Sequence, residues 1–271
     1  MNIIKTDYFG EVESIRLGYG PIGPPLMSVF MYVVDTLVID TGQPNMAKAL
    51  LGLLRGKNLK HIILTHHHED HSGNAARISA QHAIPVGGHR LTAEKMNAGF
   101  LIRSYQRYVW GKAPPVNVIP FNDIFETDRF TFTPVPTPGH SQDHTVFLEK
   151  EQGWLFSGDL YLGERIKFFR ADECFAEQIA SLKKVLALDF DSLFCAHNPC
   201  LKNGKQKIKN KLQFLEDLYG NIRELVGKGH SEKAVIKALD PRNDRGIKLI
   251  TMGNASFANM VHSATVSIRN H

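Results

Sequence analysis

The amino-acid sequence predicts an α/β (α+β) fold with a helical C-terminal extension. In the first two hundred residues, short apolar runs rich in β-branched residues alternate with segments in which apolar residues recur every three or four positions. After residue 204 only the helical pattern remains. The 271 residues, 43% of them hydrophobic, suffice for one sizeable core. We therefore predict one domain over residues 1–203 and a helical extension over residues 204–271.

Five elements are expected before residue 81. In chain order they are strands at 28–34, 36–40 and 59–65 and helices at 45–54 and 75–80. The turn residue Asp35 separates the first two strands, which predicts a hairpin. Residues 18–26 are dense in glycine and proline, which predicts a loop, and loops on rigid scaffolds often contact ligands.

The remaining elements follow the same logic. The middle of the chain should contain strands at 130–137, 145–148, 153–157 and 192–196 and a helix at 176–186. The C-terminal extension should contain helices at 207–226, 231–239 and 256–268, with a break at 241–244. Ser231 is the expected N-cap of its helix, with Glu232 in the first turn.

Residues 65–71, with the sequence Thr-His-His-His-Glu-Asp-His, hold the densest chemistry of the chain. Neutral imidazole is the commonest protein ligand for zinc, and one ion needs three or four converging donors. The alternative is a solvated turn that is merely rich in histidine. The apolar strand at 59–65 argues against that alternative, because residues at the end of a buried strand are rigidly held yet open to solvent. We therefore predict a metal-ligand cassette.

Three more predicted strands are followed by a histidine or an aspartate, namely His140, Asp159 and His197. A single histidine at a strand end is usually just a satisfied polar residue. Together with the cassette, these three residues supply the donors that the cassette lacks.

In these motifs the chain resembles the metallo-β-lactamase superfamily in its glyoxalase II-like, two-metal form. The family signature His-x-His-x-Asp-His is met by His66, His68, Asp70 and His71. The family's later histidine, bridging aspartate and last histidine correspond to His140, Asp159 and His197. The resemblance covers roughly residues 12–200 and implies a four-layer αββα metallo-β-lactamase sandwich with the metals at one edge.

The resemblance also implies two divalent metal ions, with zinc as the first expectation and iron or manganese as alternatives. It assigns His66, His68 and His140 to one ion, Asp70, His71 and His197 to the other, and Asp159 to both. Two such ions about 3.5–4 Å apart share a hydroxide and polarise the substrate oxygen, which is the logic of two-metal hydrolysis. In this scheme Asp70 is also catalytic, because it orients the bridging hydroxide.

Supporting residues are expected around the ligands. Asp40, in the segment Val-Ile-Asp-Thr-Gly, matches an aspartate that supports the site in the family. Tyr161 is the candidate for oxyanion stabilisation, with His144 as a second candidate, and packing is the alternative role for both. His67 and Glu69 alternate with the ligands, so they should point away from the metals.

Some departures from related patterns narrow the function. His71 replaces the cysteine that the commonest zinc β-lactamases place near the second metal, which argues against β-lactamase activity. His68 stands where flavodiiron proteins carry a glutamate, which argues against that redox branch. Ala196 precedes His197 where glycine is usual, so this ligand has the weakest match.

Charge and cysteine content suggest the surroundings of the protein. The formal net charge is +5, and residues 201–250 alone carry twelve bases against six acids. These bases alternate with core-type residues, so we favour the wet faces of amphipathic helices over a nucleic-acid site. Three cysteines, the absence of an apolar run of about 20 residues and the absence of a secretory signal predict a reduced, cytoplasmic protein without a membrane span. The oligomeric state is not predicted.

The leading hypothesis is a metal-dependent hydrolase that acts on an ester, thioester or lactone bond of a small molecule. The loop at 18–27 and the aromatic residues Tyr105, Tyr108 and Trp110 could wall an acyl pocket, or the aromatic residues could be helix core. No match to the basic glutathione-binding motif of the thioesterases is found.

Two alternatives on the same scaffold stay open. One is a nuclease or phosphodiesterase that holds phosphates with Lys207, Lys209 and Lys211. The other is a mononuclear iron sulfur dioxygenase.

Overall fold

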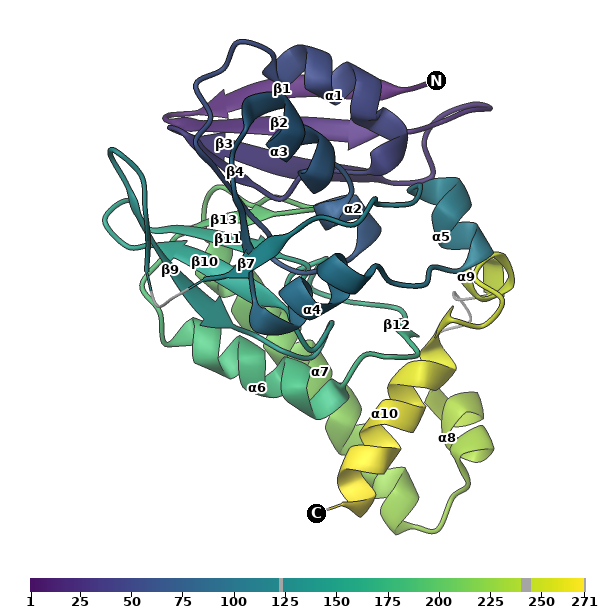
Figure 1. Ribbon diagram of the computed structural model, residues 1–271. Helices are drawn as coiled ribbons and strands as arrows, with labels where there is room; N and C mark the ends of the chain where they lie inside the picture. Colours follow the sequence, from purple (N-terminus) through teal and green to yellow (C-terminus); the bar gives the residue numbers. More distant parts are fainter. Residues whose placement is uncertain (122–123, 240–244, 271) are drawn as a thin grey trace.

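The computed structural model describes residues 1–121, 124–239 and 245–270, and two facing β-sheets form its centre (Figure 1). Sheet A contains, in spatial order, β1 (Ile3–Phe9), β2 (Val12–Gly18), β3 (Ser28–Val34), β4 (Leu37–Ile39), β5 (His61–Ile63), β6 (Val86–Gly88) and β7 (Val118–Pro120). Sheet B contains β13 (Ser192–Cys195), β11 (Trp154–Gly158), β10 (Thr145–Glu149), β9 (Thr131–Pro136) and β8 (Phe125–Glu126). Sheet A is antiparallel from β1 to β4 and parallel from β4 to β7.

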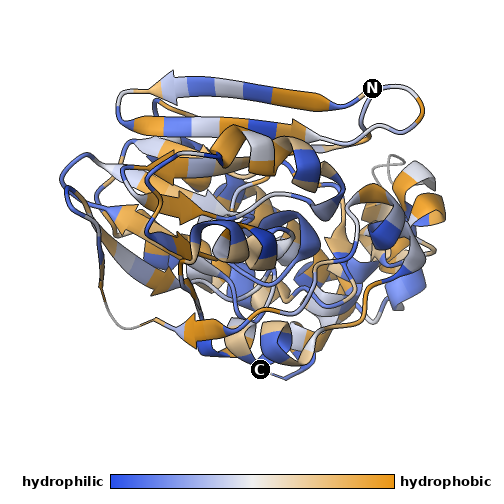
Figure 2. Ribbon diagram, turned by 45° about the horizontal axis from the view of Figure 1, so that its top comes forward, coloured by the Kyte–Doolittle hydropathy of each residue, from blue (hydrophilic) through white to orange (hydrophobic). Residues whose placement is uncertain are grey.

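Helices cover the outer face of each sheet. The helices on sheet A are α1 (Ala47–Leu54), α3 (Ala75–His82) and α4 (Arg90–Ala98), and their apolar side chains share one core with that sheet. The helices on sheet B are α6 (Phe175–Leu186), α7 (Gly204–Gly227) and α10 (Phe257–Arg269). Hydrophobic residues predominate on the inner strands, whereas the helices and the outer N-terminal strands mix hydrophobic and hydrophilic residues (Figure 2). The αββα sandwich implied by the resemblance is therefore confirmed.

Aromatic side chains fill the space between the sheets. Phe156 and Phe194 from sheet B stack with ring centroids 4.8 Å apart, and Tyr32 from sheet A meets both rings edge-on. Tyr32 also donates a hydrogen bond from its hydroxyl to the carbonyl of Cys195, at 2.6 Å. Burying large rings across the interface supplies hydrophobic stabilisation and fixes the spacing of the two sheets.

Most predicted elements occupy their expected places. The hairpin of β3 and β4 turns at Asp35, which adopts a positive φ of 54°. The helix at 45–54 divides into a short 3-10 turn, η1 (Pro44–Met46), and α1. The sequence analysis missed β1 and β2, whose exposed or mixed polar faces weaken the apolar pattern. It also missed the short helices α2 (Glu69–Ser72) and α5 (Ser104–Val109).

The C-terminal segment packs into the core of sheet B. Helix α7 begins at Gly204, where the extension was expected to begin, and α8 (Glu232–Leu239) and α10 follow as predicted. The predicted break at 241–244 lies outside the described residues, and α9 (Arg245–Ile250) follows it. The division of the chain at residue 204 stays a prediction, since α7 and α10 share their core with sheet B. None of the described helices is both long and apolar enough to cross a bilayer.

The ends of several strands meet at one edge of the sandwich. Thr145 at the start of β10 donates its N–H to the carbonyl of Thr65 beyond β5, at 2.8 Å. Phe30 of β3 donates its N–H to the carbonyl of Ala196 beyond β13, at 2.6 Å. These bonds connect the two sheets where the cassette and His197 leave their strands.

Replacing Phe156 with alanine should lower the free energy of unfolding by about 3–5 kcal/mol, because the change leaves a cavity between the sheets. Urea denaturation followed by circular dichroism measures this loss. The matched control is Phe168→Ala, since Phe168 is partly exposed and its removal should cost far less. Equal losses in the two variants would contradict the assigned inter-sheet core.

Candidate metal centre

Three imidazoles converge in a first buried group formed by His66, His68 and His140. His68 directs Nδ1 toward the other two rings, 2.9 Å from Nε2 of His66 and 3.1 Å from Nε2 of His140. His66 and His68 come from the cassette after β5, whereas His140 follows β9. All three are buried, and their ligand atoms lie within 4.8 Å of one another. The group therefore has the donors of one metal site.

A second group contains Asp70, His71 and His197. Nε2 of His197 lies 3.2 Å from Oδ2 of Asp70, and Nε2 of His71 lies 3.8 Å from the same oxygen. Asp70 and His71 lie in the one-turn helix α2, so this turn aims both side chains inward. His197 arrives from the end of β13. These ligand atoms also lie within 4.8 Å of one another.

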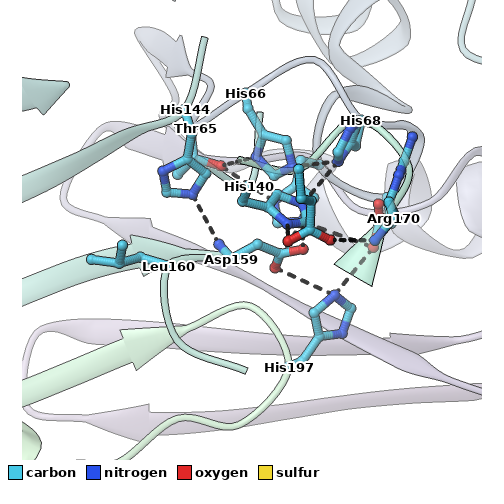
Figure 3. A network of polar contacts seen from close by, with 12 residues as sticks. Thr65, His66, His68, His140, His144, Asp159, Leu160, Arg170 and His197 are labelled. Carbon is cyan, nitrogen blue, oxygen red and sulfur yellow. Dashed lines mark hydrogen bonds and ion pairs between the residues drawn. The ribbon is translucent and has the colours of Figure 1, made fainter. Parts of the chain in front are cut away.

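Asp159 lies between the two groups (Figure 3). Its Oδ2 is 3.3 Å from Nε2 of His140, in the first group. Its Oδ1 is 3.3 Å from Nε2 of His71 and 3.5 Å from Nε2 of His197, in the second group. One carboxylate thus presents one oxygen to each set of donors.

The carboxylate of Asp40 connects the cassette to sheet A. It accepts hydrogen bonds from the backbone N–H of Thr65 at 2.8 Å and from the Thr65 hydroxyl at 2.8 Å. Its Oδ2 also lies 2.7 Å from Nδ1 of His71, which fixes that ring with Nε2 facing the centre. Asp40 adopts a positive φ of 57°, an uncommon conformation for a non-glycine residue that such a set of contacts can hold. The structure places Asp40 in the supporting position that the resemblance implied.

Other ligands are oriented in the same manner. Nδ1 of His197 lies 2.9 Å from the carbonyl of Ser28, and Nδ1 of His66 lies 3.0 Å from the Thr65 hydroxyl. His144 accepts the backbone N–H of Asp159 on Nε2 at 3.1 Å, and its Nδ1 lies 2.8 Å from the hydroxyl of Thr137. His144 therefore holds the loop that carries Asp159, which is a positioning role and leaves its ring fully engaged.

Two buried polar atoms at the centre make no hydrogen bond. Nε2 of His71 and Oδ1 of Asp159 face each other at 3.3 Å, and neither is hydrogen-bonded among the residues that the structure describes. An unpaired buried donor or acceptor is costly, and a cation between these atoms would satisfy both. The residues present thus fit divalent ions, as the chemistry of a histidine and carboxylate set requires.

The electrostatics of the centre agree with that fit. Burial and the neighbouring imidazoles hold the pKa of His66 well below its usual value, so the ring is neutral and has a free lone pair. Burial alone would raise the pKa of Asp159, but His71 and His197 hold it well below its usual value. Burial opposes the charged form of His197, but Asp159 and Asp70 raise its pKa to about 9. A negatively charged carboxylate facing imidazoles is the arrangement that a cation stabilises.

His67 and Glu69 point away from the ligand groups, as expected. His67 contacts Asp143, with Nδ1 at 2.9 Å from Oδ1, and its backbone N–H donates to Oδ2 at 2.9 Å. Oε1 of Glu69 accepts a hydrogen bond from the side chain of Gln106 in α5, at 2.9 Å. Both residues attach the cassette to elements around it.

Tyr161 lies in the core of sheet B and not among the ligands. Its side chain is 2% exposed and belongs to the apolar cluster beneath α7. Burial and the nearby Cys200 raise the pKa of its hydroxyl. These contacts are those of a packing residue, which was the alternative role, and the catalytic role of Tyr161 stays a prediction.

The sequence analysis missed the part that Lys211 plays. Lys211 of α7 is 1% exposed and donates from Nζ to the carbonyl of Leu160 at 2.6 Å, directly after Asp159. Lys207 and Asn210 of the same helix bind the carboxylate of Glu164 in the same loop. The available signal was a lysine at a core position of an amphipathic helix, between Ile208 and Leu215.

Comparisons with known proteins agree with this geometry. A family model described as the metallo-beta-lactamase superfamily matches residues 24–197. The lactamase-like protein notP from Aspergillus is 30% identical over 76% of this chain and 54% of its own length. The thioesterase pkgB from Emericella nidulans is 28% identical over 71% of this chain and 52% of its own length. The chain thus spans about half the length of these two curated relatives.

A solved structure shares the fold along nearly the whole chain. A beta-lactamase domain protein from Burkholderia ambifaria aligns with a TM-score of 0.72 at 16% identity, covering 97% of this chain and 89% of that one. The match to the family model covers both ligand groups and the strands that carry them. The chain therefore belongs to the metallo-beta-lactamase superfamily.

Proposed function

We propose that this protein is a binuclear, metal-dependent hydrolase that cleaves an ester, thioester or lactone bond. The observation that carries the proposal is the position of Asp159, with one oxygen toward each group of ligands. A single metal would need only one of these oxygens, whereas two metals need a bridge whose negative charge offsets their repulsion. We retain the glyoxalase II-like, two-metal form and zinc as parts of this proposal.

Bound divalent ions would supply a bridging hydroxide as nucleophile and would polarise the scissile carbonyl. The chain's own residues hold the geometry around that reaction. His71 and His197 keep the carboxylate of Asp70 inside the centre, where it accepts a proton and orients the attacking oxygen. His144 and Lys211 fix the loop that carries Asp159.

An apolar hollow lined by the two residues directly before Trp110 supports an acyl substrate. The Trp110 ring lies 6.2 Å from the His197 ring, centroid to centroid. Directly before Trp110, Tyr108 and Val109 line a hollow of about 120 Å³ together with the loop at residues 19–26. Ile22 and Leu26 of this loop are exposed, which is unusual for large apolar side chains beside a polar centre. Of the parts expected to wall an acyl pocket, Tyr108 and the loop line this hollow, which supports the proposal.

Similarity to thioesterases supports the same bond class. The relative pkgB is named a thioesterase, and another relative, from Aspergillus fumigatus, is named an atrochrysone carboxyl ACP thioesterase, with 26% identity. The three cysteines are unpaired, which suits the reducing compartment that we propose, the cytoplasm.

The contacts of the basic helix weaken the nuclease alternative. Lys207 is paired with Glu164, and Lys211 is buried against a carbonyl, so neither is free for a phosphate. Of the three lysines considered for that role, only Lys209 is exposed. The lysines that motivated a phosphodiester substrate therefore do not support it.

Protein purified without added metal should contain two equivalents of divalent metal by elemental analysis. Asp159→Asn should lower the content toward one equivalent and reduce kcat/KM for thioesters and esters at least a hundredfold, because the bridge loses its charge. The matched control is Asp217→Asn, which changes an exposed aspartate of α7. One equivalent of iron together with oxygen uptake on a persulfide would instead establish the sulfur dioxygenase alternative.

Lys211→Met should weaken metal binding about tenfold, because the carbonyl of Leu160 loses its donor and the Asp159 loop is less firmly held. Competition with a fluorescent chelator measures the affinity. Lys209→Met, on the exposed face of the same helix, should leave it unchanged. An unaltered affinity in Lys211→Met would show that α7 has no part in positioning the bridge.

Tyr108→Ala should reduce kcat/KM several-fold for decanoyl esters but leave acetyl esters unchanged, since only a long chain reaches the hollow. Rates on a series of 4-nitrophenyl esters provide the comparison. The control is Tyr8→Ala, because Tyr8 is exposed on β1 at the edge of sheet A. A loss of equal size for all chain lengths would contradict the assigned acyl wall.

A further inference from the structure

Arg170 brings a positive charge to the edge of the metal centre. It lies on the two-residue strand β12 (Phe169–Arg170), where it pairs with Ala255 of β14 (Ala255–Ser256). Figure 3 shows the side chain beside His68, one of the ligands of the first group. The C-terminal segment thus holds this residue in place through the small sheet of β12 and β14.

The guanidinium of Arg170 is mostly buried and only weakly paired. Its side chain is 22% exposed, and Nε lies 3.3 Å from Oδ1 of Asp172, whose side chain is 55% exposed. Among the residues that the structure describes, Nη1 and Nη2 of Arg170 donate to no protein acceptor. Most of its donor capacity is therefore left over.

The groups around Arg170 come from the cassette, from α5 and from the segment that follows β12. The charge of Arg170 acts on His67, His68, Glu69 and Tyr105. Glu69 lies too far from the guanidinium for an ion pair, and its Oε2 is buried without a hydrogen-bond partner. Glu173 accepts the backbone N–H of Arg170 on Oε1 at 2.9 Å and directs Oε2 toward His140 at 3.5 Å. Neither carboxylate satisfies the guanidinium.

A guanidinium whose Nη1 and Nη2 donors are free prefers to bind a carboxylate. Taking the charge out of water is costly unless hydrogen bonds compensate it. Its planar fork matches the two oxygens of a carboxylate, which it binds by paired, charge-assisted hydrogen bonds. Because Arg170 lies beside His68, a carboxylate bound to it could belong to the same small molecule as the scissile bond.

We propose that Arg170 binds a carboxylate of the substrate, so that the substrate is an ester, thioester or lactone carrying a carboxylate on one side of the scissile bond. This inference rests on the proposed hydrolase function and narrows its substrate class. Tyr108 and the loop at 19–26 line the apolar hollow, the neighbouring Trp110 lies beside His197, and Arg170 lies beside His68. A substrate with one apolar end and one anionic end fits both sides at once.

The test compares two aryl esters on the metal-loaded protein, 4-nitrophenyl hydrogen glutarate and the neutral 4-nitrophenyl hexanoate. Wild-type protein should prefer the glutarate, and Arg170→Met should lower kcat/KM at least tenfold for the glutarate while leaving the hexanoate unchanged. Arg170→Lys should retain part of the preference. Asp172→Asn is the control, because it removes the charge of the one carboxylate that the Arg170 guanidinium contacts among the described residues, and it should keep the preference.

Two outcomes with active enzyme would overturn the inference. Equal losses on both esters would show that Arg170 serves the fold. Equal rates of the wild type on both esters would remove the carboxylate preference while leaving the hydrolase function intact.

If neither ester is cleaved, that result counts against the hydrolase function. A binding measurement still tests whether Arg170 binds a carboxylate. Calorimetry should show that the metal-loaded wild type binds glutarate more tightly than butyrate, and that Arg170→Met loses this difference. Retention of the difference in Arg170→Met would contradict the inference whatever the catalytic result.

Discussion

The burial of the Asp159 carboxylate is the constraint on which the rest of the centre depends. A carboxylate removed from water is strongly destabilising unless nearby groups compensate its charge. Here the ring nitrogens of His140, His71 and His197 surround its two oxygens at 3.3–3.5 Å. Because each oxygen serves a different group of ligands, the position of this one side chain sets the spacing between the two groups. Everything that fixes its loop is therefore part of the metal centre.

Gly158 shows how tightly the backbone encloses this loop. It ends β11 with a positive φ of 46°, and a Cβ at this position would meet Nε2 of His144 at 2.8 Å and Cβ of Thr65 at 2.9 Å. Thr65 is in turn held by the carboxylate of Asp40. Thr65 of the cassette and His144 thus pack directly against the loop that carries Asp159, and position 158 has no room for a side chain. Lys211 fixes the loop from the other side by binding the carbonyl of Leu160.

The sequence could predict that the seven candidate ligands gather in one place because each follows an apolar run, the order of such runs is visible locally, and the resemblance supplied the set; their role as ligands stays a prediction. The αββα layers followed from the resemblance, and the helical spacing located α7, α8 and α10. Lys211 and Arg170 escaped prediction because their roles arise from contacts across the fold. Tyr161 was proposed from its nearness to Asp159 in the sequence, whereas its packing against the core of sheet B depends on contacts that only the fold shows.

Several lysines that make the C-terminal segment basic have structural contacts. Lys205 donates to the carbonyl of Leu188 at 2.7 Å, Lys207 pairs with Glu164, and Lys211 is buried. These lysines stabilise the loop that carries Asp159 and the end of α6, so their positive charge is not presented as a field for a polyanion. Arg170 differs, because its donors remain free at the edge of the centre. The C-terminal segment therefore contributes rigidity through α7 and, by pairing β14 with β12, holds Arg170, whose Nη1 and Nη2 donate to no acceptor among the described residues. An apolar group is favoured beside Trp110 and an anionic group beside His68, so a substrate with both ends would bind in one orientation, with its reactive carbonyl over the two groups of ligands.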